Sequence, residues 1–118
     1  VGGKGTDALS SGAGEDILIG GVMQLVFRLD VMGPIMAEWT RTDAAYSDRI
    51  GHLIGALPGG NNGSVILTPV NILDDRTVDS LFGEDGLDLY FGNSTGIGAE
   101  RFVRKAAKEV LLSLPNPV

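Results

Sequence analysis

A nine-residue period constrains this chain more than any other feature. Residues 2–10 read GGKGTDALS and residues 11–19 read SGAGEDILI, and far downstream residues 74–82 read DDRTVDSLF and residues 83–91 read GEDGLDLYF. An aspartate fills the sixth place of every unit and a large apolar residue fills the eighth. These residues are Asp7, Asp16, Asp79 and Asp88, and Leu9, Leu18, Leu81 and Tyr90. Two columns that agree in phase predict stacked structural repeats.

The period predicts a tight turn over the first six residues of each unit and a very short strand over the last three. One such unit cannot bury its apolar residue alone, so neighbouring units must stack, which builds a parallel β-roll. Stacking also brings the aspartates of adjacent layers together. Because like charges repel, we expect a hard divalent cation between them, and calcium accepts six to eight oxygens from carboxylates and backbone carbonyls.

The segment GGKGTDALSSGAGEDILIGG resembles the nonapeptide repeat of RTX, or haemolysin-type, calcium-binding proteins, and residues 35–92 also resemble a segment of large bacterial RTX-repeat proteins. The resemblance implies a β-roll module of a large bacterial secreted protein, located outside the cell or on its surface, with Ca²⁺ as cofactor. By this resemblance, the expected calcium ligands are the side chains of Asp7, Asp16, Asp79 and Asp88 and the carbonyls of Gly3, Gly5, Gly12 and Gly14.

The second block, residues 74–93, departs from the pattern of the first, residues 2–21. Asp74 and Asp75 replace the glycine pair, Thr77 replaces the fourth glycine, and Glu84 stands at another glycine place. The extra carboxylates either add ligands or mark a turn that no longer binds a cation. Further candidate ligands are Asp75, Glu84 and Gly86.

Two units in isolation make only half-sites, since the resemblance places each ion between unit n and unit n+2. We therefore expect the two blocks to stack in one roll, with residues 22–70 as an excursion, so that Asp7 or Asp16 shares ions with the second block. The whole chain, 1–118, is then one domain. Pairing of two copies through the open roll edge at residues 1–10, as a homodimer, is a competing solution.

The excursion is expected to be helical. Apolar residues at helical spacing over 46–57, ended by Pro58, predict one helix, and a shorter helix is predicted over about 34–40. Short strands are predicted at 64–68 and 70–73, where they lead the chain back into the roll.

Two segments allow more than one interpretation. Residues 22–33 are strongly apolar and allow a strand that either extends the roll or pairs with 64–67. The tail is expected to be a helical cap over 97–115 that covers the open end of the roll, after a polar linker at 92–98. A C-terminal export signal is the alternative that the resemblance permits. The expected fold class is thus mainly β with helices, a short roll interrupted by the helical excursion and capped by a C-terminal helix.

Composition narrows the function. Fifteen acidic against nine basic residues give a net charge of −6, which argues against nucleic acid or an anionic membrane as partner and favours bound cations. Cysteine is absent, which excludes disulfides and thiolate zinc sites. No apolar run approaches the roughly 20 residues of a membrane helix, so no membrane insertion is expected. The chain starts within the register of a repeat, as expected of a piece of a longer polypeptide or a truncated reading frame.

Catalytic interpretations lack support. The only histidine, His52, lies within a predicted helix, where a surface or packing role is favoured over acid-base chemistry. Trp39 is expected to be a core anchor, and GNSTGIG at 92–98 lacks the lysine of a phosphate-binding loop. We therefore expect a non-enzymatic module that folds or is stabilised with calcium. The alternative is an adhesion or self-assembly module that recognises a partner through an apolar patch around residues 22–36.

Overall fold

The computed structural model describes residues 1–24, 29–103 and 108–115. The chain divides into two compact units, one of Val1–Gln24 with Ile72–Val118 and the other of Leu25–Asn71. Among the described residues there are two helices and eight short strands, in parallel and antiparallel sheets. The fold is therefore mixed α/β, and the second unit corresponds closely to the predicted excursion.

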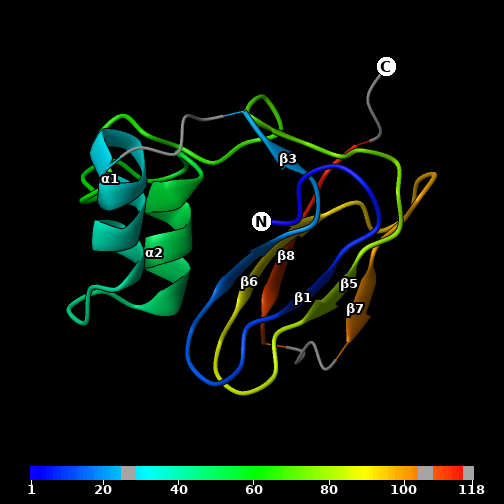
Figure 1. Cartoon of the computed structure of the whole chain (residues 1–118). Helices are drawn as coiled ribbons and strands as arrows, with labels where there is room; N and C mark the ends of the chain where they lie inside the picture. The colour runs from blue at the N-terminus through cyan, green and yellow to red at the C-terminus, as the bar shows by residue number, and fades with distance from the viewer. Residues whose placement is uncertain (25–28, 104–107, 116–118) are drawn as a thin grey trace. The chain divides into compact units, whose positions relative to one another are not determined.

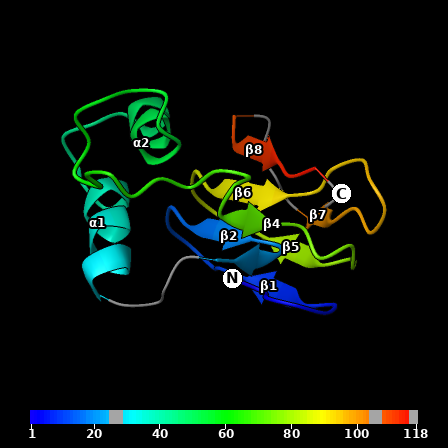
Figure 2. The same ribbon diagram turned by 90° about the horizontal axis from the view of Figure 1, so that it is seen from above.

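Six strands of the first unit form two parallel sheets. One sheet has the order β1-β5-β7 and the other has the order β2-β6-β8, so consecutive strands alternate between the sheets (Figure 1). Figure 2 shows β2, β6 and β8 following one another across the unit. The bounds are β1 Ala8–Ser10, β2 Ile17–Ile19, β5 Ser80–Phe82, β6 Leu89–Gly92, β7 Arg101–Val103 and β8 Val110–Ser113.

The two repeat blocks stack in register. Leu9 aligns with Leu81 in one sheet, and Leu18 aligns with Tyr90 in the other. These eighth-place residues make the core of the unit, in which Leu18, Leu81 and Tyr90 are buried and Leu9 packs against them. The predicted parallel pairing of the two blocks and the inward eighth place are confirmed.

The predicted helical cap over 97–115 is wrong. Residues 101–103 form β7 and residues 110–113 form β8, which add a third strand to each sheet. The eighth-place pattern continues there, because Phe102 aligns with Leu81 and Leu111 aligns with Tyr90. Part of the expected helix, residues 104–107, lies outside the described residues.

A two-stranded antiparallel sheet joins the point where the chain leaves the first unit to the point where it returns. Strand β3 (Val22–Met23) pairs with β4 (Ile72–Leu73). Of the segment 22–33, for which a strand was predicted, only residues 22 and 23 form one, and their partner is not 64–67. Residues 25–28 lie outside the described residues, and the strand is wrong for 29–33, which are helical. The strand predicted at 64–68 is not formed, and the strand predicted at 70–73 is limited to its last two residues.

The second unit contains two packed helices, α1 (Leu29–Trp39) and α2 (Tyr46–Leu53). Helix α1 starts five residues before the predicted start and carries Pro34 inside it, and α2 ends before the predicted end at residue 57. Trp39 is buried, as expected of a core anchor. Its ring meets Tyr46 edge-on at 5.9 Å, and the guanidinium of Arg49 lies 5.0 Å from its centroid.

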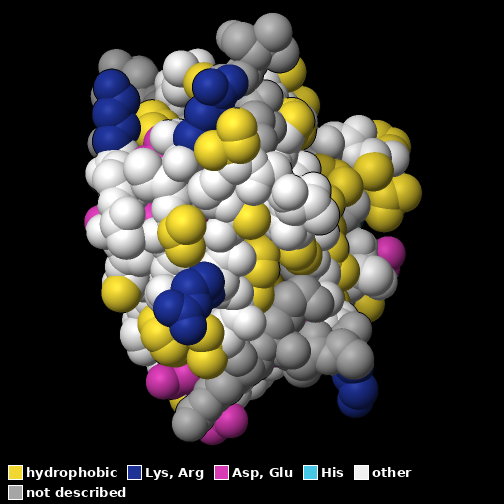
Figure 3. All heavy atoms as spheres, turned by 90° about the vertical axis from the view of Figure 1, so that its right-hand side faces the viewer, with side chains coloured by type: hydrophobic (Ala, Val, Ile, Leu, Met, Phe, Trp, Pro, Cys, Tyr) yellow, Lys and Arg dark blue, Asp and Glu magenta, His cyan; other side chains and the backbone are white. Residues whose placement is uncertain are grey.

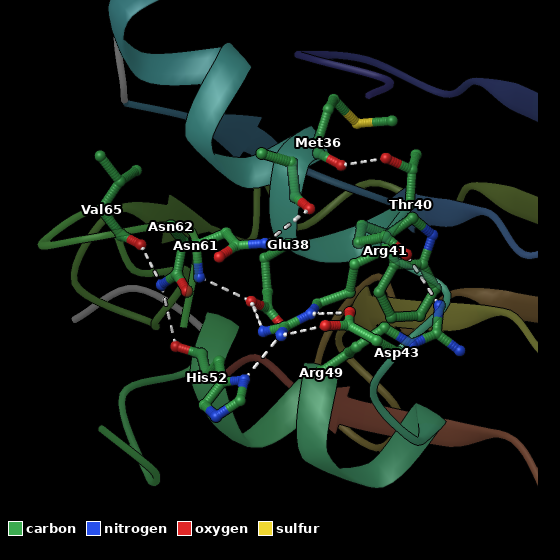
Figure 4. Close-up of polar contacts among 12 residues, drawn as sticks. Met36, Glu38, Thr40, Arg41, Asp43, Arg49, His52, Asn61, Asn62 and Val65 are labelled. Atoms are coloured by element: carbon green, nitrogen blue, oxygen red, sulfur yellow. Dashed lines mark hydrogen bonds and ion pairs between the residues drawn. The ribbon is translucent and has the colours of Figure 1, made fainter. Parts of the chain in front are cut away.

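A buried carboxylate ties these helices to the following loop. Glu38 on α1 is fully buried, and its Oε2 lies 2.9 Å from Nδ1 of His52 on α2 (Figure 4). Its Oε1 accepts hydrogen bonds from the backbone N–H of Asn61 and from the guanidinium of Arg41. His52 therefore takes part in the polar contacts that join α1 to α2.

Candidate metal centre

The sixth-place residues form two acidic columns, one beside each parallel sheet. Each residue immediately precedes a strand, so the strand register also aligns the acids. The A column is Asp7, Asp79 and Glu100, and the B column is Asp16, Asp88 and Glu109. Sequence reasoning predicted the four aspartates and missed both glutamates.

Backbone hydrogen bonds fix the first step of each column. The N–H of Asp7 donates to Oδ1 of Asp79 at 2.7 Å, and the N–H of Asp16 donates to Oδ1 of Asp88 at 2.8 Å. The structure therefore brings both Asp7 and Asp16 next to an aspartate of the second block, whereas the sequence predicted this for one or the other. The other oxygen of each of Asp7, Asp16 and Asp79 is buried without a hydrogen-bond partner.

The second and third acids of each column are buried, whereas Asp7 and Asp16 are half-buried. Asp79 and Asp88 are fully buried, and Glu100 is 7% and Glu109 4% exposed. The face drawn in Figure 3 shows few Asp and Glu side chains. Uncompensated carboxylates are costly to bury, so this arrangement needs either protons or a cation.

Burial and like charge shift the acid equilibria in both columns. Burial raises the pKa of Asp88 to about 6, and the neighbouring carboxylates of Glu109 and Asp16 add to the effect. Burial raises the pKa of Glu100 to about 8, with contributions from Asp74 and Asp79. Burial also raises the pKa of Asp79. The charged forms of these groups are therefore disfavoured in the fold by itself.

The turns of the A column are closed by side-chain hydrogen bonds. Oδ2 of Asp75 accepts a 2.6 Å hydrogen bond from the N–H of Gly5, and Oδ1 accepts one from the N–H of Thr77 at 3.1 Å. The hydroxyl of Thr77 lies 2.7 Å from the carbonyl of Gly5. The N–H of Gly3 donates to Gly21. Burial opposes ionisation of Asp75, but these hydrogen bonds hold its pKa below the usual range. Asp75 and Thr77, which replace the usual glycines of the second block, thus hydrogen-bond the turn of the second block to the turn that contains Gly5.

The turns of the B column stack backbone on backbone. The N–H of Gly14 donates to the carbonyl of Asp85 at 3.1 Å. Gly86 has a φ of +108°, and a Cβ there would lie 1.8 Å from the carbonyl oxygen of Gly14, so only glycine fits. Glu84 holds a φ of +62° at its glycine place, and its Oε2 lies 3.9 Å from the position that a Cβ of Gly12 would occupy.

The columns offer oxygens in pairs. Among residues 1–24, 29–103 and 108–115, no three His, Cys, Asp or Glu side chains make a group that could hold a metal ion. A cation in a column would therefore take two carboxylates from adjacent layers and complete its shell with backbone carbonyls, a donor set of hard oxygens that suits calcium. The predicted carbonyl ligands Gly3, Gly5, Gly12, Gly14 and Gly86 lie in the turns that precede the strands, and their role as ligands stays a prediction.

The two glutamates carried a signal that sequence reasoning overlooked. Glu100 and Glu109 are nine residues apart, and so are the apolar residues Phe102 and Leu111 that follow them. This spacing repeats the sixth and eighth places of the earlier units. The segment 92–98, expected to be a linker, is the turn that leads into this third layer.

Comparison of the chain with protein-family models, curated proteins and solved structures finds no match. The resemblance to RTX repeats therefore stays a prediction from the repeat pattern. Within the described part of the chain, no helix has the length and apolar character needed to cross a membrane.

Proposed function

We propose that the chain is a non-enzymatic calcium-binding module whose first unit is a β-roll of the RTX type. One observation carries the proposal: the sixth-place aspartates of distant repeats stack in pairs of one half-buried and one fully buried residue, and oxygens of Asp7, Asp16 and Asp79 lack hydrogen-bond partners. A divalent cation between adjacent layers compensates these charges.

Two pairs of residues would hold calcium. Asp7 and Asp79 would hold an ion in the A column, and Asp16 and Asp88 would hold an ion in the B column. The carbonyls of the glycine turns would complete each shell. The bound ion supplies positive charge and a preference for many oxygen ligands, while the chain places those oxygens through strand register.

Calcium would then control folding of the first unit. Each pair joins residues from the two repeat blocks, which are 72 positions apart in sequence. Without cation, repulsion between the carboxylates opposes stacking of the blocks, and with millimolar calcium the charge is neutralised and stacking is favoured. Such a switch suits a secreted or cell-surface protein that folds after export.

A calcium titration of the chelated protein tests the proposal, with magnesium as the control ion. We expect far-ultraviolet circular dichroism to gain β structure and the melting temperature to rise with calcium but not with magnesium. Unchanged spectra and melting temperature after chelation would overturn the proposal.

Assembly through the roll edge is a second candidate function. Strands β1 and β2 are end strands of their sheets, and a hollow of about 300 Å³ beside them is lined by residues that include Leu9 and Leu18. End strands present unpaired backbone groups to a further strand. Light scattering during the same titration distinguishes the two, because assembly raises the molecular mass and a folding switch alone leaves it unchanged.

A further inference from the structure

The third layer of the A column contains a second pair of carboxylate oxygens without partners. Oδ2 of Asp79 and Oε1 of Glu100 are both buried and accept no hydrogen bond. Asp79 is fully buried and Glu100 is 7% exposed. A Cβ on Gly20 would lie 3.2 Å from Oδ2 of Asp79 and 2.9 Å from Cγ of Glu100, so both acids border the same space.

The carboxylate of Glu100 has one oxygen with a hydrogen-bond partner and one without. Its Oε2 accepts a hydrogen bond from the backbone N–H of Asn93, which leaves Oε1 unpartnered. Asp74 lies in the same corner, where its Oδ2 meets the side-chain amide of Asn93 at 3.4 Å. Glycines at positions 20 and 92 leave room beside the carboxylates, since a Cβ on Gly92 would lie 2.7 Å from Oε2 of Glu100.

We propose that Asp79 and Glu100 form a further cation site, which takes a hard divalent ion of the calcium class. The proposal rests on the function proposed above and extends it to a residue outside the aspartate repeats. Asp79 would be shared by two ions, one with Asp7 and one with Glu100, since each carboxylate oxygen offers more than one lone pair. The A column would then bind ions in two adjacent steps.

The B column differs at the corresponding step. A Cβ on Gly83 would lie 1.9 Å from the hydroxyl of Tyr90 and 2.4 Å from Oδ2 of Asp88, so the phenol fills the space beside that carboxylate. In the other sheet, the eighth-place residue of the same layer is Leu81, whose side chain has no polar atom to place beside Asp79. The inference is therefore restricted to the A column.

Counting bound calcium ions tests the shared ligand. Native mass spectrometry and isothermal titration would compare the wild type with Asp7→Asn, Asp79→Asn and Asp48→Asn, the last an exposed acid in the second unit. We expect Asp7→Asn to lose one ion, Asp79→Asn to lose two and Asp48→Asn to lose none. Equal losses in Asp7→Asn and Asp79→Asn would overturn the site at Glu100. A wild type that binds no calcium would instead overturn the function proposed above.

Variants of Glu100 distinguish two states of its buried carboxyl group, one that binds a cation and one that carries a proton. If a cation lies there, Glu100→Gln binds one ion fewer than the wild type, and Glu100→Asp, which keeps the charge, retains the ion. If the carboxyl simply carries a proton, Glu100→Gln keeps the full number of ions and is at least as stable in chelator, which would overturn the inference. Should Glu100→Gln fail to fold, the comparison of Asp7→Asn with Asp79→Asn decides.

Discussion

The backbone N–H of Asp16 donates a 2.8 Å hydrogen bond to Oδ1 of Asp88, which lies 72 positions further along the chain. The side chain of Asp16 does not take part in this bond, and its Oδ2 is buried without a partner. The backbone therefore aligns the two layers, while the side chain remains available to a cation. This separation of roles makes Asp16 a suitable position for a functional substitution.

Replacing Asp16 with alanine is expected to weaken calcium binding by at least about tenfold, which corresponds to about 1.4 kcal/mol. The substitution removes a carboxylate from the B column but leaves the backbone hydrogen bond to Asp88 in place. Isothermal titration calorimetry measures the change. Asp30→Ala, in the first turn of α1 and outside the repeats, is the control. Equal effects of the two substitutions would contradict the assignment of Asp16.

The stability of the calcium-free protein is expected to fall as pH rises from about 4 to about 8. The folded pKa of Asp88, about 6, and that of Glu100, about 8, lie above the ordinary values of 3.8 and 4.5. A carboxyl whose pKa is higher in the folded than in the unfolded protein binds its proton more tightly when folded. Its contribution to the free energy of unfolding is therefore present below the unfolded pKa and is lost as pH rises through the folded pKa. Each unit of difference changes the free energy of unfolding by about 1.4 kcal/mol.

Urea denaturation in chelator at several pH values measures this dependence. Asp88→Asn should flatten the lower part of the pH profile, and Glu100→Gln should flatten the upper part. Saturating calcium should restore stability at pH 8, because the ion binds the charged carboxylates. A profile in chelator that does not change with pH would show that the column acids are not buried together in the folded protein.

The nine-residue period made the first two layers predictable. It predicted which residues face inward and that Asp7 or Asp16 meets the second block, whereas the particular pairs, Leu9 with Leu81 and Asp7 with Asp79, come from the strand register of the structure. Parallel pairing requires equal turns and equal strands, and the two blocks have both. The excursion did not disturb this register, because β3 and β4 pair where the chain leaves and returns.

The third layer was missed for two physical reasons. Between β6 and β7 the chain runs from Gly92 to Arg101, a turn longer than the earlier ones, so the nine-residue step is broken there. In addition, Val103, Val110 and Leu114 fit one face of a helix, so the apolar pattern of the tail also predicts a helix. Strand pairing with the two existing sheets decides in favour of β structure.

The start of α1 was mispredicted because proline favours the first turn of a helix. Pro34 therefore indicated a start near residue 34, but the helix begins at Leu29. Proline at position 34 removes one N–H donor and its ring crowds the carbonyl of Asp30, a cost that packing of α1 against α2 can offset.

Replacing Gly86 with alanine is expected to destabilise the first unit by at least about 2 kcal/mol. The added Cβ would lie 1.8 Å from the carbonyl oxygen of Gly14, and the φ of +108° strains any residue other than glycine. Gly3 is a matched control, since its φ is +88° but no atom lies within 4 Å of a Cβ built there. Gly3→Ala should therefore cost only the backbone strain, about 1 kcal/mol. Urea denaturation followed by circular dichroism compares the two, and similar losses would argue against close stacking of the B-column turns.

Replacing Glu38 with alanine is expected to destabilise the second unit by about 2 kcal/mol, because it leaves the N–H of Asn61 and the side chains of His52 and Arg41 without their shared acceptor. Asp43→Ala removes an exposed partner of the same arginine and should cost less than about 1 kcal/mol. The fluorescence of Trp39, the only tryptophan, measures urea unfolding of this unit.

The pH profile of Glu38→Ala provides a second check with the opposite sign to that of the columns. Burial disfavours ionisation of Glu38, but hydrogen bonds from His52, Asn61 and Arg41 outweigh it and hold its pKa below 4.5. Its contribution is therefore present above the unfolded pKa and is lost as pH falls through the folded pKa. In Glu38→Ala, the stability of the second unit, followed by Trp39 fluorescence, should therefore fall less at acidic pH than in the wild type. The affinity for calcium should stay unchanged. A loss of affinity like that of Asp16→Ala would show that the second unit takes part in ion binding.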